Sequence, residues 1–176
     1  MDTSAITADS FRAAVGSFAA GVTIITTLDE TGAPQALTAT AFSSVSMSPP
    51  LCLVCIDKRA RTYRPLLLKG RFAVNILGAD QKWLSARFAS AVTDRFAAVP
   101  WVPGVATGCP ILDGALAWME CRVVEIHSGG DHDIFLGRPI SVQVQDGAPL
   151  VYWRGRYSTL PPPPAEAEGR EGNPAA

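Results

Sequence analysis

Four short segments of the sequence combine residue types that can hold a flat ring or an anion. The first, residues 37–46, mixes small with hydroxyl-bearing side chains, and its hydroxyl groups lie on Thr38, Thr40, Ser43, Ser44 and Ser46. Small side chains let a ring approach the backbone, and hydroxyl and N–H groups can then contact ring carbonyls or phosphate oxygens. On spacing alone, an edge strand that leads into a Ser-rich turn is the simpler interpretation.

The second segment is cationic. Lys58, Arg59 and Arg61 follow an apolar run and precede Thr62, after which a short helix is expected. Cationic side chains beside the N–H groups of a helix N-terminus form an anion site. A solvated charged turn is the alternative, and for any single cation it is the better interpretation.

The third and fourth segments lie later in the chain. Residues 129–133 read Gly-Gly-Asp-His-Asp, so a tight turn places His132 at a strand junction, where it can meet a ligand or remain an exposed turn residue. His127, at a strand end, is interpreted as structural. Residues 152–157 interleave aromatic side chains with arginines, which can stack on a nicotinamide or adenine ring or hold a pyrophosphate. The same residues can equally close a barrel end or form a dimer interface.

The four cysteines do not predict a metal site. Cys52 and Cys55 have C-x-x-C spacing, but they lie in the apolar run 51–56, which is typical of a buried strand. Side chains three positions apart on a strand point to opposite faces, so the two sulfur atoms are expected to diverge and to act as small apolar filler. Cys109 and Cys121 have no second close pair and no histidine at ligand spacing. The sequence also shows no catalytic triad and no paired carboxylates.

Length and charge set further limits. The 176 residues suit one domain, and the net charge of −1 gives no electrostatic basis for binding nucleic acid or an anionic membrane. The polar start of the chain lacks the basic and apolar parts of a signal peptide, and the densest apolar run is too short to span a bilayer. A cytoplasmic protein with reduced cysteines is therefore expected.

The hydrophobic pattern predicts mostly strands. A helix is expected from Thr7 or Asp9 to about Ala20, with an apolar face formed by Phe11, Val15 and Phe18. Strands are expected at 22–28, 35–42, 51–56, 72–77, 116–127, 134–144 and 150–153, and short helices at 63–69 and 80–88. Residues 43–50 are expected to form a loop, 99–110 an irregular stretch, and 128–132 a break between strands.

This order of elements favours one fold class. Many hairpin-linked strands with few helices predict a closed antiparallel barrel with flanking helices, and the sequence contains no strand–Gly-rich turn–helix unit that would indicate a Rossmann domain. Residues 8–160 are expected to form the single domain. Residues 161–176 begin with four prolines and continue with Ala, Glu and Gly, so they predict a disordered Pro-rich tail.

Taken in order, these segments resemble the flavin reductase family of FMN-binding split-barrel proteins, the reductase components of two-component flavin-dependent monooxygenases. The resemblance runs from about Phe11 to Leu160. Its carriers are the stretches 11–12, 21–23, 38–46 (Thr-Ala-Thr-Ala-Phe-Ser-Ser-Val-Ser), 49–51, 72–77 (Phe-Ala-Val-Asn-Ile-Leu), 81, 88–89, 108–112, 120–121, 130–132 with 137, 149–152 and 155–157. Each match is short, but their order and spacing together are specific.

The resemblance implies a mainly β fold, an antiparallel Greek-key split barrel with flanking helices. It implies an NAD(P)H-dependent oxidoreductase that passes a hydride from NADH or NADPH to FMN or FAD and supplies reduced flavin to a monooxygenase component. Such proteins are usually homodimers with flavin sites near the subunit interface. A split-barrel flavoprotein with another acceptor, such as a corrinoid or a pyridoxine phosphate, and a flavin-binding module without catalysis are the alternatives.

The resemblance also implies roles for individual residues. Residues 38–46 would line the isoalloxazine ring, the turn 58–62 would hold the flavin phosphate, and His132 would be the candidate catalytic residue beside the nicotinamide. Ala41 stands where many relatives carry serine, so one hydrogen bond to the ring is either missing or made by main chain. The expected cofactor contacts are Thr38, Ala39, Thr40, Ala41, Phe42, Ser43, Ser44, Ser46, Lys58, Arg59, Arg61, Thr62, Asn75, Phe135, Arg154 and Tyr157.

Overall fold

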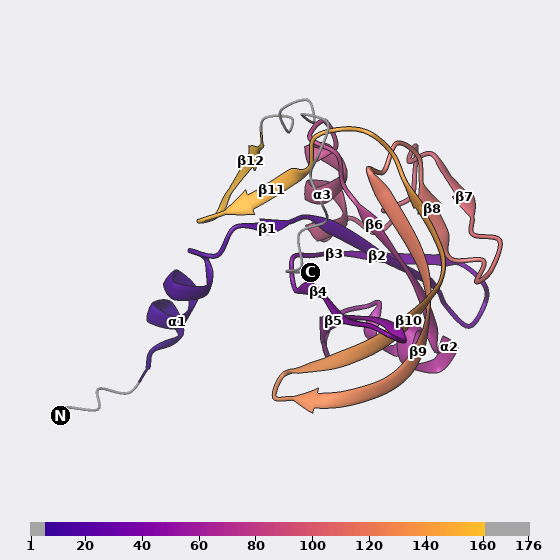
Figure 1. Cartoon of the computed structure of the whole chain (residues 1–176), viewed down its shortest axis with the longest axis horizontal. Helices are drawn as coiled ribbons and strands as arrows, with labels where there is room; N and C mark the ends of the chain where they lie inside the picture. The colour runs from indigo at the N-terminus through magenta and orange to yellow at the C-terminus, as the bar shows by residue number, and fades with distance from the viewer. Residues whose placement is uncertain (1–5, 161–176) are drawn as a thin grey trace.

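A computed structural model of the chain describes residues 6–160, so the predicted Pro-rich tail lies outside the described residues. One seven-stranded antiparallel sheet forms the body (Figure 1). Its strands in spatial order are β3 (Pro34–Ala39), β2 (Thr23–Leu28), β6 (Arg71–Ile76), β9 (Ala117–Gly129), β10 (His132–Val144), β5 (Pro50–Asp57) and β4 (Phe42–Met47). The predicted mainly β, antiparallel class is confirmed.

The connection between the two edge strands shapes this sheet. β3 and β4 lie at opposite edges, yet only residues 40–41 separate them in the chain. Because so short a link cannot cross a flat seven-stranded sheet, the sheet must curl until its two edges approach each other. The backbone N–H of Cys55 on β5 donates to the carbonyl oxygen of Ala41 in this link, at 3.0 Å. The curl therefore brings β3, β4 and β5 together at one place.

Smaller elements cover the ends of the sheet. A three-stranded sheet contains β1 (Ala20–Gly21), β11 (Leu150–Trp153) and β12 (Arg156–Thr159), and a two-stranded one contains β7 (Trp101–Pro103) and β8 (Pro110–Leu112). The helices are α1 (Ala8–Val15), α2 (Tyr63–Lys69) and α3 (Lys82–Ala89). No helix among the described residues has the length and apolar character needed to cross a bilayer.

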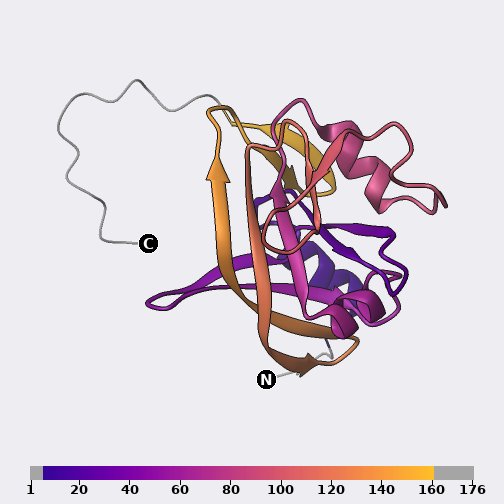
Figure 2. The same ribbon diagram turned by 90° about the vertical axis from the view of Figure 1, so that its right-hand side faces the viewer.

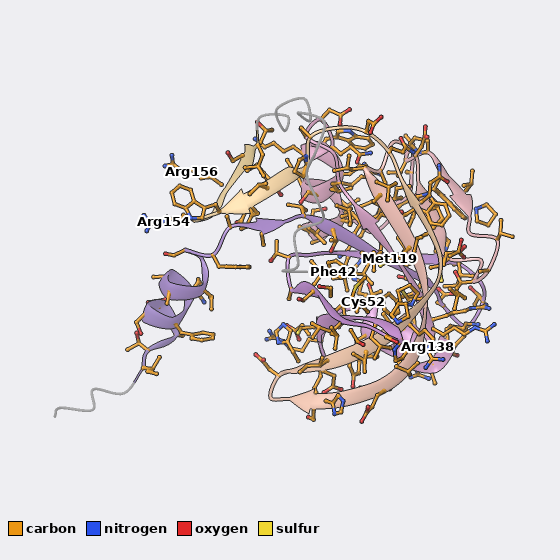
Figure 3. The ribbon with its side chains drawn as sticks, in the orientation of Figure 1. Phe42, Cys52, Met119, Arg138, Arg154 and Arg156 are labelled. Carbon is orange, nitrogen blue, oxygen red and sulfur yellow. The ribbon has the colours of Figure 1, made fainter. Side chains whose placement is uncertain are left out.

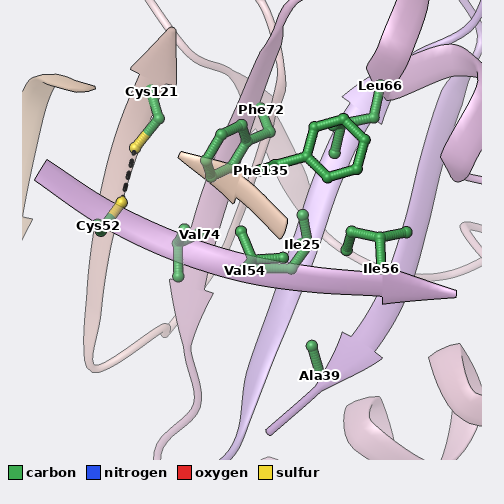
Figure 4. Packing of buried hydrophobic residues seen from close by; sticks show 10 residues of the cluster. All are labelled: Ile25, Ala39, Cys52, Val54, Ile56, Leu66, Phe72, Val74, Cys121 and Phe135. Carbon is green, nitrogen blue, oxygen red and sulfur yellow. Dashed lines mark hydrogen bonds between the residues drawn. The ribbon is translucent and has the colours of Figure 1, made fainter. Parts of the chain in front are cut away.

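The main core lies inside the curl, between β5, β6, β9 and β10 (Figure 4). β5 alternates between buried and partly exposed residues, so Cys52 faces the core and Cys55 faces away from it, which confirms the predicted divergence of their sulfur atoms. The Sγ atom of Cys52 lies 3.8 Å from that of Cys121 on β9. The strand between them, β10, carries Gly137 opposite Cys52, and a Cβ atom added there would lie 2.5 Å from Phe72 Cζ.

Helix α1 differs from its prediction in length and in packing. Thr7 caps it, as one of the two predicted caps, through a capping box with Ser10, but the helix ends at Val15, well before Ala20. Its predicted core face is in fact exposed, because Phe11 and Phe18 retain 60% and 77% of their accessible surface. Figure 1 shows α1 standing apart from the sheet. Nothing in the described chain covers this apolar face.

Three stretches predicted without strands contain strand residues, and in one of them, 99–110, β7 spans Trp101–Pro103. Residues 43–50 belong to the β4–β5 hairpin, so Phe42 begins β4 instead of ending the preceding strand. Figure 2 shows this hairpin extending away from the body of the sheet. The predicted break at 128–132 shrinks to the turn Gly130–Asp131, because β9 continues to Gly129 and β10 starts at His132. The helix predicted at 63–69 has those bounds in the structure.

Candidate binding cavity

A cavity of about 420 Å³ opens where the edges of the sheet meet. Its volume lies within the range of small-molecule sites. Its walls come from β3, the β3–β4 link, the end of β5, the turn before α2, the C-terminal end of α3 and the start of β10, and the lining residues are Leu37, Thr38, Ala39, Thr40, Ala41, Cys55, Asp57, Ala60, Arg61, Thr62, Phe88, Ala89, Arg95 and His132. Residues from three of the four sequence segments are thus brought together.

The floor of the cavity consists of small residues. Ala39 is buried, Thr40 and Ala41 are exposed, and the chain changes from one edge strand to the other at this point. The hydroxyl of Thr38 donates to the carbonyl oxygen of Ser85 on α3, at 2.7 Å, which fixes β3 against the helix. A flat ring can approach this floor closely because no side chain larger than threonine stands on residues 38–41.

Lys58 was expected to bind phosphate, but its ammonium group is occupied within the chain. Its Nζ donates to the carbonyl oxygen of Gly130 at 2.7 Å and to Ser128 Oγ at 3.1 Å, and lies 3.1 Å from Asp133 Oδ1. Two of these contacts are hydrogen bonds, and the third is an ion pair with Asp133. Lys58 therefore fastens the turn before α2 to the β9–β10 hairpin, and its contact with phosphate stays a prediction.

Arg59 is neutralised in the same way. Its Nη2 and Nε contact the carboxylate of Asp57 at 2.8 Å and 3.1 Å, and its backbone N–H donates to the same group at 2.8 Å. The side-chain hydrogen bond from Arg59 holds the pKa of Asp57 far below its usual range. This bidentate pair compensates the charge of Arg59 within the chain, and its contact with phosphate stays a prediction.

Two arginines at the cavity wall remain uncompensated. Arg61 Nη2 contacts the carbonyl oxygen of Ala91 at 3.4 Å, and Arg95 Nη1 contacts that of Ala36 at 3.0 Å. The Nε atom of Arg95 is buried and has no hydrogen-bond partner among the described residues. Neither guanidinium forms an ion pair within residues 6–160. Burial, and then the positive charge of Arg61, lower the pKa of Arg95, so the two cations lie close together.

His132 also lines the cavity and is the first residue of β10. It pairs with Asp57 in the β5–β10 register, and its Nδ1 lies 2.7 Å from Asp131 Oδ1. That contact lowers the pKa of the Asp131 carboxyl. A carboxylate beside Nδ1 favours the tautomer with its proton on Nδ1, which leaves Nε2 as the nitrogen available to a ligand.

Six expected contacts do not line this cavity because of where their strands place them. Phe42, Ser43, Ser44 and Ser46 lie on β4, where the serine hydroxyls are outside the cavity lining. Asn75 and Phe135 have no accessible surface at all. Asn75 Oδ1 accepts from Leu112 N at 2.8 Å, and Phe135 packs edge-on against Tyr63. Their burial leaves no atom for a cofactor to touch, so the structure assigns both to the core.

Arg154 and Tyr157 belong to another part of the molecule. Arg154 is exposed beside α1, on the wall of a separate cavity of about 690 Å³ (Figure 3). The hydroxyl of Tyr157 is 2.9 Å from Ser85 Oγ, so this ring holds β12 against α3. Neither residue lines the cavity of 420 Å³, and the fourth sequence segment therefore does not join the first three.

Arg95, Asp57 and Phe88 also line this cavity, although the sequence did not predict them there. Arg95 follows α3 and lies 34 positions after Arg61, so no local spacing relates the two cations. Phe88 was expected in a core, and it is buried with one side toward the cavity. A search for cations without a carboxylate neighbour in the sequence would not have found Arg95, because Asp94 precedes it directly.

A curled antiparallel sheet carries a small-residue floor beside two arginines without a carboxylate partner among residues 6–160, an arrangement suited to a small β protein with an anionic ring ligand. The flavin reductase like domain model matches residues 15–161, and the chain belongs to that family.

Relatives from several bacteria agree with this membership. The chain is 42% identical over 156 residues to the flavin reductase (NADH) of Kitasatospora aureofaciens, which covers 87% of this chain and 82% of that protein. It is 39% identical over 153 residues to the monooxygenase reductase subunit HsaB of Rhodococcus jostii, over 86% of this chain and 77% of that one. It also matches a probable flavin reductase of Rhizobium meliloti at 45% identity, but spans only 48% of its length.

The fold is also similar to a solved structure. The NADH:FAD oxidoreductase SgcE6 of Streptomyces globisporus, in complex with NAD and FAD fragments, superposes with a TM-score of 0.83 at 36% identity. That comparison covers 88% of this chain and 93% of SgcE6. The similarity thus extends over most of both chains.

Proposed function

We propose that the chain is an NAD(P)H-dependent flavin reductase that reduces FMN or FAD and supplies the reduced flavin to a partner monooxygenase. One observation carries the proposal: segment 38–41, two uncompensated arginines and His132 meet in one cavity of a chain that belongs to the flavin reductase like family. The relatives named as NADH-dependent flavin reductases and as monooxygenase reductase subunits support the activity and the class of partner.

The residues present fit a flavin. Bound flavin supplies a hydride acceptor to a reduced nicotinamide. The chain has to hold two flat rings in contact, and the floor at Ala39 and Ala41 lets one ring lie against the main chain. Arg61 offers a charged, forked donor to the flavin phosphate, and nothing in the described chain competes for it as a carboxylate partner. His132 Nε2 can accept a hydrogen bond from the nicotinamide carboxamide.

Steady-state kinetics test the proposal. The purified protein should oxidise NADH or NADPH in the presence of FMN, FAD or riboflavin and should not do so without flavin. Absence of turnover with every flavin and both nicotinamides would refute the function.

The phosphate contact can be tested at Arg61. Arg61→Ala should weaken FMN by more than tenfold relative to riboflavin, because a charge-assisted hydrogen bond contributes about 1.5–3 kcal/mol and riboflavin has no phosphate to lose. Arg59→Ala removes the same charge from the same turn but an arginine already paired with Asp57, so it serves as the matched control. Equal losses of FMN and riboflavin affinity in Arg61→Ala would contradict the assignment.

We also propose a homodimer in the cytoplasm. An eight-residue helix is marginal alone, and α1 buries none of its residues against the described chain, so its apolar side chains need a second surface. The exposed aromatic residues Tyr152 and Trp153 on β11 offer apolar area nearby. All four cysteines are free thiols, which supports a reducing compartment. Light scattering of the purified protein tests the dimer, and a monomer at micromolar concentration would contradict it.

A further inference from the structure

Three arginines lie side by side on the sheet, one on each of the middle strands β6, β9 and β10. Arg71 is the direct partner of Arg122 in the β6–β9 register, and Arg122 is the direct partner of Arg138 in the β9–β10 register. Directly opposite residues on antiparallel strands point to the same face, with Cβ atoms about 4.5–5.5 Å apart. The three side chains therefore form a continuous row across the sheet, which we call the arginine row.

The arginine row faces away from the main core. Phe72, Cys121 and Gly137 are direct chain neighbours of the three arginines, and the first two are fully buried in that core. Gly137 faces the same way, since a Cβ atom added there would lie 2.5 Å from Phe72 Cζ. Successive side chains on a strand point to opposite faces, so the arginines point to the outer face. None of them lines the cavity of 420 Å³.

The arginine row is electrostatically unfavourable in the chain by itself. Like charges directly opposite each other on neighbouring strands are destabilising, and Arg122 has such a neighbour on each side. None of the three arginines forms an ion pair within residues 6–160. Arg71 is held in place, because its Nε atom is buried and has no hydrogen-bond partner among those residues. The counter-charge that this row requires is therefore expected on another molecule.

The two carboxylates that flank Arg122 along β9 are engaged elsewhere. Glu120 precedes Arg122 by two positions, but its side chain is fully buried, and its Oε1 accepts from the N and Oγ1 atoms of Thr107, each at 2.7 Å. Glu125 pairs with His127 at 3.3 Å. Neither carboxylate neutralises the arginine row.

We propose that the arginine row is a docking surface for a carboxylate-rich segment of a partner protein. Guanidinium groups form forked, charge-assisted hydrogen bonds to carboxylates, so three of them side by side can hold several acidic side chains together. A nucleic acid fits less well, because the row holds only three cations and the whole chain has a net charge of −1.

The position of the arginine row separates it from the flavin chemistry. The row lies on the middle strands of the curled sheet, whereas the cavity of 420 Å³ lies where the edge strands meet. A partner that docks on the row therefore does not have to enter the cavity. The inference goes beyond the proposed function and does not depend on it.

Binding of an acidic peptide tests the inference. The probe is a short, fluorescently labelled polyglutamate peptide, and its dissociation constant is measured by fluorescence anisotropy at low and at physiological ionic strength. Arg122→Gln and Arg138→Gln each remove one charge from the arginine row. Arg156→Gln is the matched control, because Arg156 is an exposed arginine on β12 that forms no ion pair within residues 6–160. Figure 3 shows Arg156 and Arg138 on opposite sides of the molecule.

The wild-type protein should bind the peptide, and the affinity should fall as salt is added. Each row variant should weaken binding about two- to fivefold, as expected for an exposed ion pair, while Arg156→Gln should leave it unchanged. Arg122→Gln should also melt at or above the Tm of the wild type, because it removes repulsion from both sides. Flavin-dependent NADH oxidation should be unchanged in both row variants, so the inference and the proposed function can fail separately.

Four results would overturn the inference. The first is the absence of peptide binding by the wild type. The second is an equal loss in Arg156→Gln, which would mean that net charge alone attracts the peptide. The third is tighter binding of a single-stranded oligothymidine of the same total charge, which would favour a nucleic acid as the partner. The fourth is a lowered Tm in Arg122→Gln, which would mean that this arginine stabilises the sheet and is not repelled within it.

Discussion

Replacing Lys58 with methionine should destabilise the protein without changing how it distinguishes FMN from riboflavin. The substitution keeps an unbranched apolar stem and removes an ammonium group that contacts Gly130 O at 2.7 Å, Ser128 Oγ at 3.1 Å and Asp133 Oδ1 at 3.1 Å. Asp133 is buried, so it loses a charge partner that water cannot fully replace. It retains Tyr63, whose hydroxyl lies 2.5 Å from Asp133 Oδ2.

The expected magnitude follows from these contacts. A hydrogen bond involving a charged group contributes roughly 1.5–3 kcal/mol, but the Lys58 side chain is 37% exposed, which screens its ion pair. We therefore expect a loss of about 2 kcal/mol in the free energy of unfolding, less than the sum of the two hydrogen bonds and the ion pair. For a domain of this size that loss lowers Tm by roughly 4–8 °C.

Thermal unfolding and flavin titration together provide the assay. Lys69→Met is the matched control, because it makes the same substitution on the last turn of α2, away from the cavity. The reasoning fails if Lys58→Met melts with the control, or if it weakens FMN tenfold relative to riboflavin. The second result would mean that the lysine leaves its three partners to bind phosphate, as the family resemblance implies.

Three further outcomes are expected. His132→Ala should raise the KM for NADH several-fold, as the loss of one hydrogen bond of about 0.5–1.5 kcal/mol implies, with flavin affinity unchanged; a fall of kcat by ~10²–10⁴ would instead make it an obligatory acid. Gly137→Ala should lower the unfolding free energy by about 1–3 kcal/mol, since its Cβ would overlap Phe72, whereas Gly21→Ala meets open space and should melt like the wild type. Hydrogen bonds from Tyr63, and then from Lys58, keep the pKa of Asp133 below its usual value. The contribution of Asp133 to the free energy of unfolding is therefore present above about pH 4 and is lost as the pH falls below that. Asp133→Asn should make the free energy of unfolding, measured with urea, less dependent on pH in this acid range, and an unchanged dependence would contradict this.

The local sequence pattern correctly predicted features that are determined by residues nearby in the chain. The helix at 63–69 was correct to the residue, because the polar turn before it and Gly70 after it both mark its ends locally. The alternation of side-chain direction along a strand was also sufficient to predict that the sulfur atoms of Cys52 and Cys55 lie on opposite faces. The predicted packing of helix α1 was wrong, because its apolar spacing predicts a buried face but does not identify the surface that would bury it.

The β4 strand shows a different limit. Its residues 43–50 have a Ser-rich, Pro-ended composition that is typical of a loop, and β4 forms because it can pair along β5. Edge strands owe much of their conformation to such pairing, and the local sequence is a weak guide to it. The serine hydroxyls therefore stayed on a predicted cofactor list although their strand carries them out of the cavity lining.

The cations show most clearly why a site is harder to predict than a fold. The sequence displays Lys58, Arg59 and Arg61 as one basic cluster, yet the fold supplies carboxylate partners to the first two and none to the third within residues 6–160. What selects a cation for an anionic ligand is the absence of a competing acceptor, and that is decided by residues such as Asp133, which lie far along the chain. The sequence could find the floor of the cavity because residues 38–41 are contiguous, as the link between two edge strands must be. It could not find the second cation, because Arg95 reaches Arg61 only after the sheet has curled and α3 has packed against β3.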